Sequence, residues 1–214
     1  MFSSQEAAMA RKLDPEEKIV SAALGLAAVQ GWSDLSLADI AKAARLSLSD
    51  LSRHFASKAQ ILAAYGRRID EKVLQEVSTE DMTGEPPRDR LFDVLMMRFD
   101  ALSEHKEALK RISADLARDP LAAAPLLRPA MQSMGWMLEA AGIDSSGVAG
   151  ALRVRGLALV WGAAFRVWLD DGEDQSKTMA ELDRRLRDAS TLMTWLSRFD
   201  PRRRRADKSG EEAA

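Results

Sequence analysis

The chain has 214 residues, of which 46% are hydrophobic and 30% are charged, and its formal net charge is -2. This balance is typical of a folded protein with a substantial core, and the length allows either one large domain or a small domain joined to a medium one. The sequence contains no cysteine, which excludes disulfides, thiol nucleophiles and thiolate metal sites.

The composition favours helix throughout. Aromatic residues make up only 6% of the chain, and Ala, Leu, Arg, Asp and Glu dominate, so strand formers are few. We therefore expect an all-α fold. Residues 1–12 lack the apolar segment of a signal peptide, and the longest uncharged apolar run, residues 156–165, is too short to cross a bilayer. The sequence predicts a cytoplasmic protein with no membrane span.

The first predicted helix begins after Asp14. Asp14 is a suitable N-cap, Pro15 suits the first helical position and Glu17 adds a carboxylate to the first turn. The helix is expected to end at Gly31. Its apolar stripe, at spacings of three and four, consists of Ile19, Ala23, Leu26 and Ala27.

Two short helices are predicted next, at about 37–44 and 48–55. A serine followed three residues later by an acid or an amide starts each of three segments, at Ser36, Ser47 and Ser57. Helices this short are not stable alone, so their apolar faces must pack against neighbours. With a tight turn at Arg45-Leu46, the three helices predict helix-turn-helix geometry.

A family resemblance is carried by this segment. It rests on Ala22-Ala23, Gly31-Trp32, Leu35-Ser36-Leu37, Ile40-Ala41, Ala44, Leu46-Ser47, Leu51, Arg53-His54-Phe55 and Ser57-Lys58. In this pattern the sequence resembles the TetR family of transcriptional regulators. The resemblance implies a recognition helix at about 48–54 that enters the major groove of double-stranded DNA. It assigns contacts with the phosphate backbone of the DNA to Ser36 and Lys58. It assigns contacts with bases or phosphates to Ser47, Leu48, Ser49, Ser52, Arg53 and His54.

The chemistry of these residue types leaves alternatives open. Serine-capped helix N-termini offer free N–H groups to a phosphate, but the same serines cap a helix whether or not DNA binds. Arg53 and Lys58 either neutralise phosphates or are solvated surface charges. Leu48 either touches a thymine methyl or packs on the first helix. His54 lies far in sequence from the second histidine, His105, so no metal site is expected.

Charge is balanced in the first part of the chain but uneven within it. Residues 1–58 carry seven basic and seven acidic side chains, whereas residues 40–68 carry six basic side chains and Asp50 alone. A phosphate-facing patch is therefore expected there. The sequence departs from the family pattern at Arg45, Leu48, Ser49 and Ser52, where glycine, lysine, glycine and tyrosine are usual. These departures bear on DNA affinity rather than on the fold.

The remaining chain is predicted to be helical at 58–78, 88–103, 105–118 and 121–141. Pro125 and Pro129 disturb the last of these, which either forms an irregular cavity wall or marks packing alone. Large, adaptable apolar side chains suit a pocket for a small apolar ligand, although each also suits an ordinary core. The predicted pocket residues are Met96, Phe99, Met134, Trp136, Met137, Trp161 and Phe165.

The last two predicted helices, 148–170 and 175–199, indicate an assembly surface. Both carry apolar residues at alternating spacings of three and four, as helices of a bundle do. The first is apolar nearly all round from Leu157 to Leu169, so a second subunit is expected to cover it. Members of the TetR family dimerise through this pair, and a dimer would present two recognition helices to a pseudo-palindromic site. The predicted interface residues are Val154, Leu157, Trp161, Trp168, Leu182, Leu186, Met193 and Leu196.

The sequence thus predicts three parts. These are a helix-turn-helix DNA-binding domain at 1–57, a helical ligand-binding and dimerisation domain at 58–200, and a mobile charged tail at 201–214. The expected function is a homodimeric DNA-binding repressor whose operator affinity responds to a small apolar ligand. No activated nucleophile, carboxylate pair or metal cluster is visible, so we expect neither an enzyme nor a cofactor.

A second resemblance supports an alternative function. Residues 90–108 and 161–186, with Asp170-Asp171 and Asp174, are similar to the lipid-binding accessory proteins of ubiquinone biosynthesis. Those proteins have a TetR-like fold without DNA recognition. The alternative is therefore an accessory protein that binds a lipid and no DNA.

Overall fold

The computed structural model describes residues 14–77 and 84–198, and it describes side chains up to residue 189. Within these residues every regular element is a helix, which confirms the predicted fold class. The predicted tail at 201–214 lies outside the described residues. The elements are α2 (Pro15–Gln30), α3 (Leu37–Ala43), α4 (Leu48–His54), α5 (Lys58–Glu76), α6 (Pro87–Ser103), α7 (Lys106–Arg118), α8 (Pro120–Ala123), the 3-10 helix η1 (Ala124–Leu126), α9 (Leu127–Ala140), α10 (Gly147–Leu169) and α11 (Ser176–Arg198).

Side-chain caps position the first three helices. The Asp14 carboxylate accepts a hydrogen bond from the N–H of Glu16 at the start of α2. Ser36 and Asp39 cap α3 reciprocally, and Ser47 and Asp50 do the same for α4. Each serine hydroxyl accepts from the third backbone N–H, and each carboxylate accepts from the serine's own N–H. The predicted starts of these helices are therefore confirmed.

The α3–α4 turn is closed by backbone hydrogen bonds. The N–H of Leu46 donates to the carbonyl of Ala41 at 2.9 Å, and the N–H of Arg45 donates to that of Lys42 at 3.1 Å. Arg45 has φ of 56°, in the left-handed region. This pattern is a Schellman ending, in which glycine is the favoured residue because it has no Cβ. The turn expected at Arg45-Leu46 forms with an arginine in the strained position.

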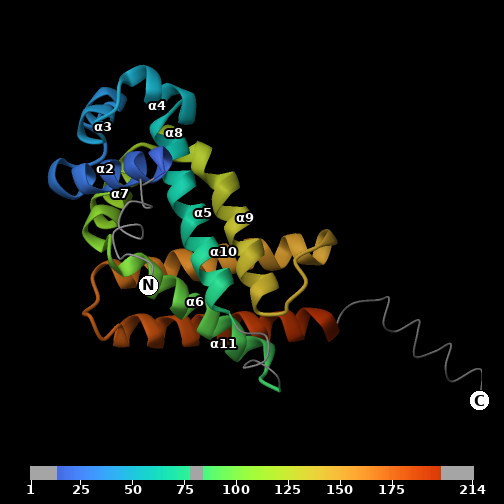
Figure 1. Cartoon of the computed structure of the whole chain (residues 1–214). Coiled ribbons are helices and arrows are strands. Elements are labelled where there is room, and N and C mark those ends of the chain that lie inside the picture. The colour runs from blue at the N-terminus through green and yellow to red at the C-terminus, as the bar shows by residue number, and fades with distance from the viewer. Residues whose placement is uncertain (1–13, 78–83, 199–214) are drawn as a thin grey trace, which may run out of the picture.

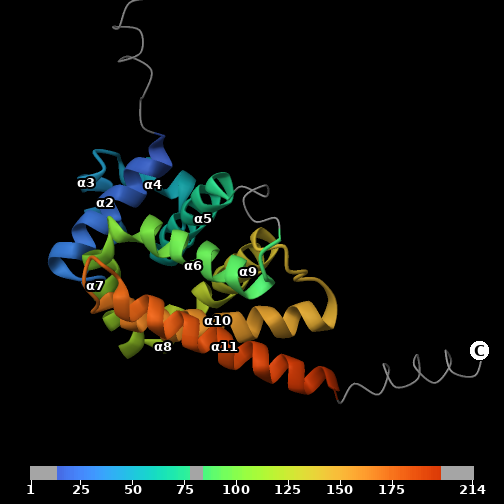
Figure 2. The same cartoon turned by 90° about the horizontal axis from the view of Figure 1, so that it is seen from below.

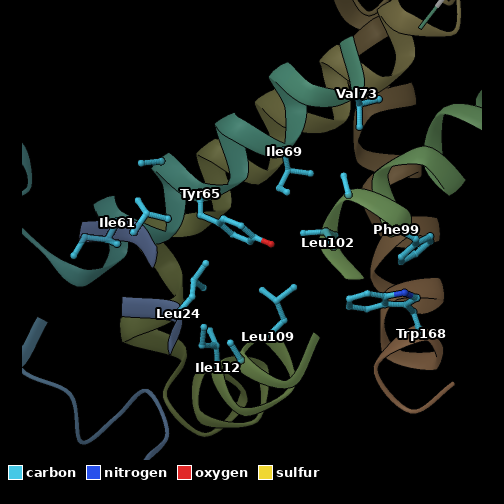
Figure 3. Close-up of a cluster of buried hydrophobic side chains, with 14 of the residues drawn as sticks. Leu24, Ile61, Tyr65, Ile69, Val73, Phe99, Leu102, Leu109, Ile112 and Trp168 are labelled. Atoms are coloured by element: carbon cyan, nitrogen blue, oxygen red, sulfur yellow. The ribbon is translucent and has the colours of Figure 1, made fainter. Parts of the chain in front are cut away.

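The helix-turn-helix unit and the α10–α11 pair lie at opposite ends of the molecule, and α5 runs between them with α9 alongside (Figure 1). The second view shows α10 and α11 packed along each other (Figure 2). The core extends through both parts of the chain. In Figure 3, Ile61, Tyr65, Ile69 and Val73 of α5 lie among labelled residues of four other helices, namely Leu24, Leu102, Leu109, Ile112 and Trp168.

The segment after Asp119 is more divided than expected. The sequence predicted one disturbed helix at 121–141, whereas the structure has α8, η1 and α9 in succession. Pro125 lies within η1, where its missing N–H cannot continue the α8 hydrogen-bond pattern. Pro129 lies in the first turn of α9, where helix N–H groups have no intrahelical partner. The prolines therefore explain both the break and the restart.

Helix α10 is the most apolar of the long helices. Among the described residues, it alone is long and apolar enough to cross a membrane by length and composition, a test that core helices also pass. Several of its side chains are buried against the rest of the chain, including Leu157, Val160, Ala164 and Trp168. The apolar character of α10 is thus used in part for packing within the chain.

Candidate nucleic-acid interface and ligand cavity

Helix α4 has one buried and one exposed side. Leu51 is fully buried and Phe55, its C-cap, nearly so, which fixes the helix on the core. On the other side Ser49 and Ser52 are exposed, and Leu48 is 52% exposed. The structure therefore brings Leu48, Ser49 and Ser52 together on one outer surface, which we call the α4 face. Leu48 does not pack into the core.

Two predicted DNA-contacting cations have partners within the chain. Arg53 is exposed and forms an ion pair with Asp50, one turn earlier on α4. Lys58 donates from Nζ to the backbone carbonyls of Trp32 at 2.6 Å and Ser33 at 3.3 Å. Its Nζ also lies 5.2 Å from the centre of the Trp32 ring. Burial lowers the pKa of Lys58, against the opposing effect of Asp115 and Asp34.

The remaining predicted DNA-contacting residues serve local structure as well. Ser36 and Ser47 are exposed N-caps whose hydroxyls are engaged with Asp39 and Asp50. In return, the hydroxyl and then the backbone N–H of each serine donate to the carboxylate of its aspartate and lower the pKa of that carboxyl group. His54 lies off the α4 face, with Nδ1 3.6 Å from Oε1 of Glu16 on α2. The geometry thus separates His54 and Lys58 from the α4 face.

Two cations that were predicted only as part of the phosphate-facing patch at 40–68, and not as individual contacts, precede α4 in the chain. Lys42, at the end of α3, and Arg45, in the turn, are exposed. Within the described part of the chain, neither makes an ion pair with a carboxylate. The sequence signal for them was their position between two serine caps, in the stretch where basic residues outnumber acidic ones.

Helix α7 holds the end of α2 and the α2–α3 loop. The Asp115 carboxylate accepts hydrogen bonds from the N–H of Trp32 at 2.7 Å and of Ser33 at 3.0 Å. These two bonds, that from Ser33 first, lower the pKa of Asp115. On the previous turn Arg111 donates to the carbonyl of Val29 at 2.9 Å. The helix-turn-helix unit is therefore attached to α7 by polar contacts as well as by packing.

A large cavity lies between α5, α6, α7, α9 and α10. Its volume is about 1060 Å³, which is of the size that accommodates small-molecule ligands. Leu109, Ile112 and Leu116 line it from α7, so the helix that carries Asp115 also forms a cavity wall. Leu126, Pro129 and Met131 line it too, and the proline-disturbed segment is thus one of its walls.

Three of the seven predicted pocket residues line this cavity: Trp136, Trp161 and Phe165. Phe99 stacks behind Trp161, with ring centres 4.3 Å apart, and belongs to the core. Met134 and Met137 are buried and Met96 is partly buried, but they do not line the cavity. Their residue type predicted burial correctly, whereas which buried side chain meets an internal space depends on packing between distant segments.

Polar groups are buried at one part of the cavity wall. Asp70 and Arg98 form an ion pair and are 6% and 7% exposed. Ser133 donates to the same Asp70 oxygen at 2.8 Å, and the Arg98 guanidinium lies 5.1 Å from the centre of the Trp161 ring. The Tyr65 hydroxyl is also buried, and burial raises its pKa well above the ordinary value. Sequence reasoning missed all four polar residues.

The predicted dimer residues fall into three groups. Leu157, Trp168, Leu182 and Leu186 are buried within the chain, and Val154 and Trp161 line the cavity. The side chains of Met193 and Leu196 lie outside the described residues. The exposed apolar surface of α10 instead consists of Val148, Leu152 and Leu159, at 92%, 51% and 78% exposure. A helix seam within one chain and a seam between chains have the same spacing, so the sequence did not separate them.

Among the described residues, no group of three or more His, Asp or Glu side chains is arranged to hold a metal ion.

The N-terminal part of the chain matches a known family. Residues 19–65 match the model of "Bacterial regulatory proteins, tetR family". No curated protein matches this chain in sequence.

Solved structures share the fold over most of the chain. A TetR transcriptional regulator from Nitrosomonas europaea has 23% identity and a TM-score of 0.66, covering 83% of this chain and 99% of its own. One from Rhodococcus sp. RHA1 has 20% identity and a TM-score of 0.59, covering 86% and 95%. The Thermus thermophilus TetR-family repressor FadR, solved with lauroyl-CoA, has 21% identity and a TM-score of 0.54, covering 80% and 91%.

Proposed function

We propose that this chain, which has the fold of a TetR-family transcriptional regulator and carries that family's N-terminal domain at residues 19–65, is a cytoplasmic homodimeric repressor. In this proposal it binds operator DNA through α4 and releases it when an apolar ligand occupies the cavity. The observation that carries the proposal is the α4 face, where Leu48, Ser49 and Ser52 are exposed on a helix fixed from behind by Leu51. It acts as a binding protein rather than as an enzyme.

The α4 face suits base contacts better than strong phosphate attraction. Leu48 can meet a thymine methyl, and the serine hydroxyls can bond to base edges or phosphates. The exposed cations beside it are Lys42, Arg45 and the Asp50-paired Arg53. With few free cations per subunit, we expect a shallow dependence of DNA affinity on salt, because that slope follows the number of phosphates neutralised.

Helix α7 connects the cavity with the helix-turn-helix unit. Ile112 and Leu116 line the cavity, while Asp115 and Arg111 hold the α2–α3 loop and the end of α2. A ligand that shifts α7 would therefore move α2 and, through it, α3 and α4. Such coupling requires that the ligand bind one arrangement of α7 more tightly than the other. The neighbouring FadR structure contains lauroyl-CoA, which favours an apolar chain as the occupant.

The homodimer is proposed to form through α10 and α11. Val148, Leu152 and Leu159 share one side of α10 and are exposed in the single chain. A second copy of the same pair would cover them across a two-fold axis, which gives a self-complementary interface. The sequence also assigns Met193 and Leu196 to this interface, but their side chains lie outside the described residues. Dimerisation then presents two α4 helices to the two halves of a pseudo-palindromic operator.

The test is DNA binding by the full chain, measured as fluorescence anisotropy with DNA that flanks its own gene. We expect specific binding that saturates at about one dimer per operator duplex, because the two α4 helices of a dimer occupy its two halves. The binding should weaken when lauroyl-CoA is added. Equal affinity for this DNA and for scrambled DNA would overturn the DNA-binding proposal. Absence of DNA binding at all salt concentrations, together with a co-purified lipid detected by mass spectrometry, would favour the accessory-protein function.

A further inference from the structure

The buried polar groups of the cavity include two that no protein group satisfies. Tyr65 and Arg98 are each only 7% exposed. Within the described part of the chain, the Tyr65 hydroxyl and the Nε–H of Arg98 have no hydrogen-bond partner. Both side chains line the cavity. A buried polar group without a partner is costly, so its presence calls for an explanation such as a bound ligand.

Packing alone does not account for the Tyr65 hydroxyl. The ring lies edge-on to His105, with centres 5.5 Å apart, and a phenylalanine would make the same contact. In Figure 3 the hydroxyl points away from α5, toward the space beside Leu102 and Leu109. Those two leucines also line the cavity and offer no polar atom. The hydroxyl is therefore directed at an apolar region of the cavity, where the polar group of a ligand can bond to it.

Arg98 is the second buried side chain with an unpaired donor. One of its terminal nitrogens is used by Asp70, and the plane of the guanidinium lies near the Trp161 ring. Its Nε–H has no hydrogen-bond partner among the described residues. Arg98 lines the same cavity as Tyr65, and its positive charge opposes the effect of burial on the pKa of Tyr65.

The charges around these two donors are already balanced. Asp70 neutralises Arg98, and Ser133 satisfies the same carboxylate oxygen. Glu104 adds a negative contribution at Tyr65. Arg67, the other arginine of the cavity lining, is exposed. A further anion buried beside Tyr65 and Arg98 would therefore meet no unpaired buried cation, and burying such a charge is strongly unfavourable. The geometry selects a neutral polar group rather than a carboxylate or a phosphate.

Counting donors and acceptors narrows the choice further. A carbonyl oxygen has two lone pairs and no hydrogen, so it can accept from the Tyr65 hydroxyl and from the Arg98 Nε–H at once. An alcohol also brings a hydrogen of its own, and one hydrogen among the three groups would stay unpaired. The rest of the nearby wall is apolar, with Leu102, Leu109 and Ile112, which suits a hydrocarbon chain.

We propose that the cavity binds a neutral carbonyl compound with an apolar chain, and that Tyr65 and Arg98 hold its carbonyl oxygen. This inference deepens the proposed function, because it names the chemical class of the ligand, but its test does not involve DNA. Tyr65 and Arg98 are in this proposal specificity residues, since they distinguish a ketone or ester from an ionised acid of equal chain length.

The experiment measures binding of three probes with equal chain length to the full chain, by isothermal titration calorimetry near neutral pH. The probes are 2-decanone, 1-decanol and decanoate. We expect 2-decanone to bind about tenfold more tightly than 1-decanol, as the loss of one buried hydrogen bond implies, and decanoate to bind most weakly. Decanoate binding as tightly as 2-decanone, or no binding of 2-decanone, would overturn the proposal.

Variants locate the site. Tyr65→Phe removes only the hydroxyl and is expected to lower 2-decanone affinity about tenfold without lowering the melting temperature of the free chain. Arg98→Lys keeps a cation for Asp70 but lacks the Nε–H, and should weaken the same probe. The matched control is Ser103→Ala, which removes a hydroxyl bonded to the carbonyl of Asp100, away from the cavity lining. Unchanged 2-decanone affinity in Tyr65→Phe contradicts the proposal even if DNA binding behaves as expected.

Discussion

The α4 face and the cavity differ in where the bonding partners of their polar groups lie in the sequence. On α4, the Ser47 hydroxyl and the Arg53 guanidinium have partners close in sequence, in the Ser47–Asp50 cap and the Asp50–Arg53 ion pair. In the cavity, polar partners come from distant segments, and two donors remain unpaired. These polar groups of α4 are thus already bonded within the chain. A ligand such as DNA can compete for them only where they are exposed. In the second region, the Tyr65 hydroxyl and the Arg98 Nε–H have no partner among the described residues.

The largest effect is expected from breaking the buried ion pair. Arg98→Met leaves Asp70 as a buried carboxylate without its cation, which should lower the free energy of unfolding by about 3–5 kcal/mol. Urea unfolding followed by circular dichroism measures this change. The double variant Asp70→Leu/Arg98→Met should recover most of the loss, because neither charge is then buried. A single variant as stable as the parent would show that this pair is not buried in solution.

The next largest effect concerns the α4 face. Arg53→Glu replaces a cation beside the DNA by an anion in both subunits, and we expect operator affinity to fall by about 100-fold. Fluorescence anisotropy with operator DNA measures the loss, and size-exclusion chromatography should show an unchanged dimer. The control is Arg128→Glu, an equal charge reversal at an exposed position of α9, which should bind as the parent does. Retained, salt-sensitive binding in Arg53→Glu would mean that α4 does not face the DNA.

A smaller effect is expected at the connection between the two regions. Asp115→Asn weakens the acceptor of the Trp32 and Ser33 N–H groups. Lauroyl-CoA should therefore change the operator affinity of this variant about fivefold less than it changes that of the parent. Ligand binding itself should persist, because Asp115 does not line the cavity. A full ligand response in this variant would exclude the Asp115 contact as the connection.

The same carboxylate predicts a dependence on pH. The N–H groups of Ser33 and Trp32 lower the pKa of Asp115 in the folded chain. The stabilisation is therefore complete above the ordinary pKa of an aspartate and is lost as the pH falls through the lowered value. Asp115→Asn should consequently reduce the difference in stability between neutral and acid pH.

The sequence predicted the structural features that depend on residues close together in the chain. The serine-acid pairs at Ser36 and Ser47 predicted the starts of α3 and α4, because a cap and its N–H partner are three residues apart. The position of Lys58 on α5 was also predicted, but its partners, the carbonyls of Trp32 and Ser33, lie 26 and 25 residues earlier. Lys58 therefore links α5 to the α2–α3 loop, and its expected phosphate contact stays a prediction.

The cavity depends on contacts that sequence spacing does not encode. Arg98 meets Asp70 across 28 residues, and Ser133 meets it across 63. Neither pair has a periodic or capping signal. Most of the large apolar residues expected inside are buried or partly buried, although Trp136 is 55% exposed. Phe99 fills the core, while Trp161, stacked on it, lines the cavity. Burial follows from residue type, whereas the face that a buried side chain presents follows from the packing of distant helices.

The smallest expected effect separates backbone strain from charge at the α3–α4 turn. Arg45 has φ of 56°, and the left-handed conformation costs a non-glycine residue about 1 kcal/mol. Arg45→Gly relieves this strain but adds freedom to the unfolded chain, so the net gain in unfolding free energy should be about 0.5 kcal/mol. Arg45→Ala removes the same charge and keeps the strain. Urea unfolding should therefore separate the two variants, while their DNA affinities, measured over a salt series, should fall equally below the parent. If glycine and alanine differed in DNA affinity as well, the turn would affect the placement of α4 and not only its local stability.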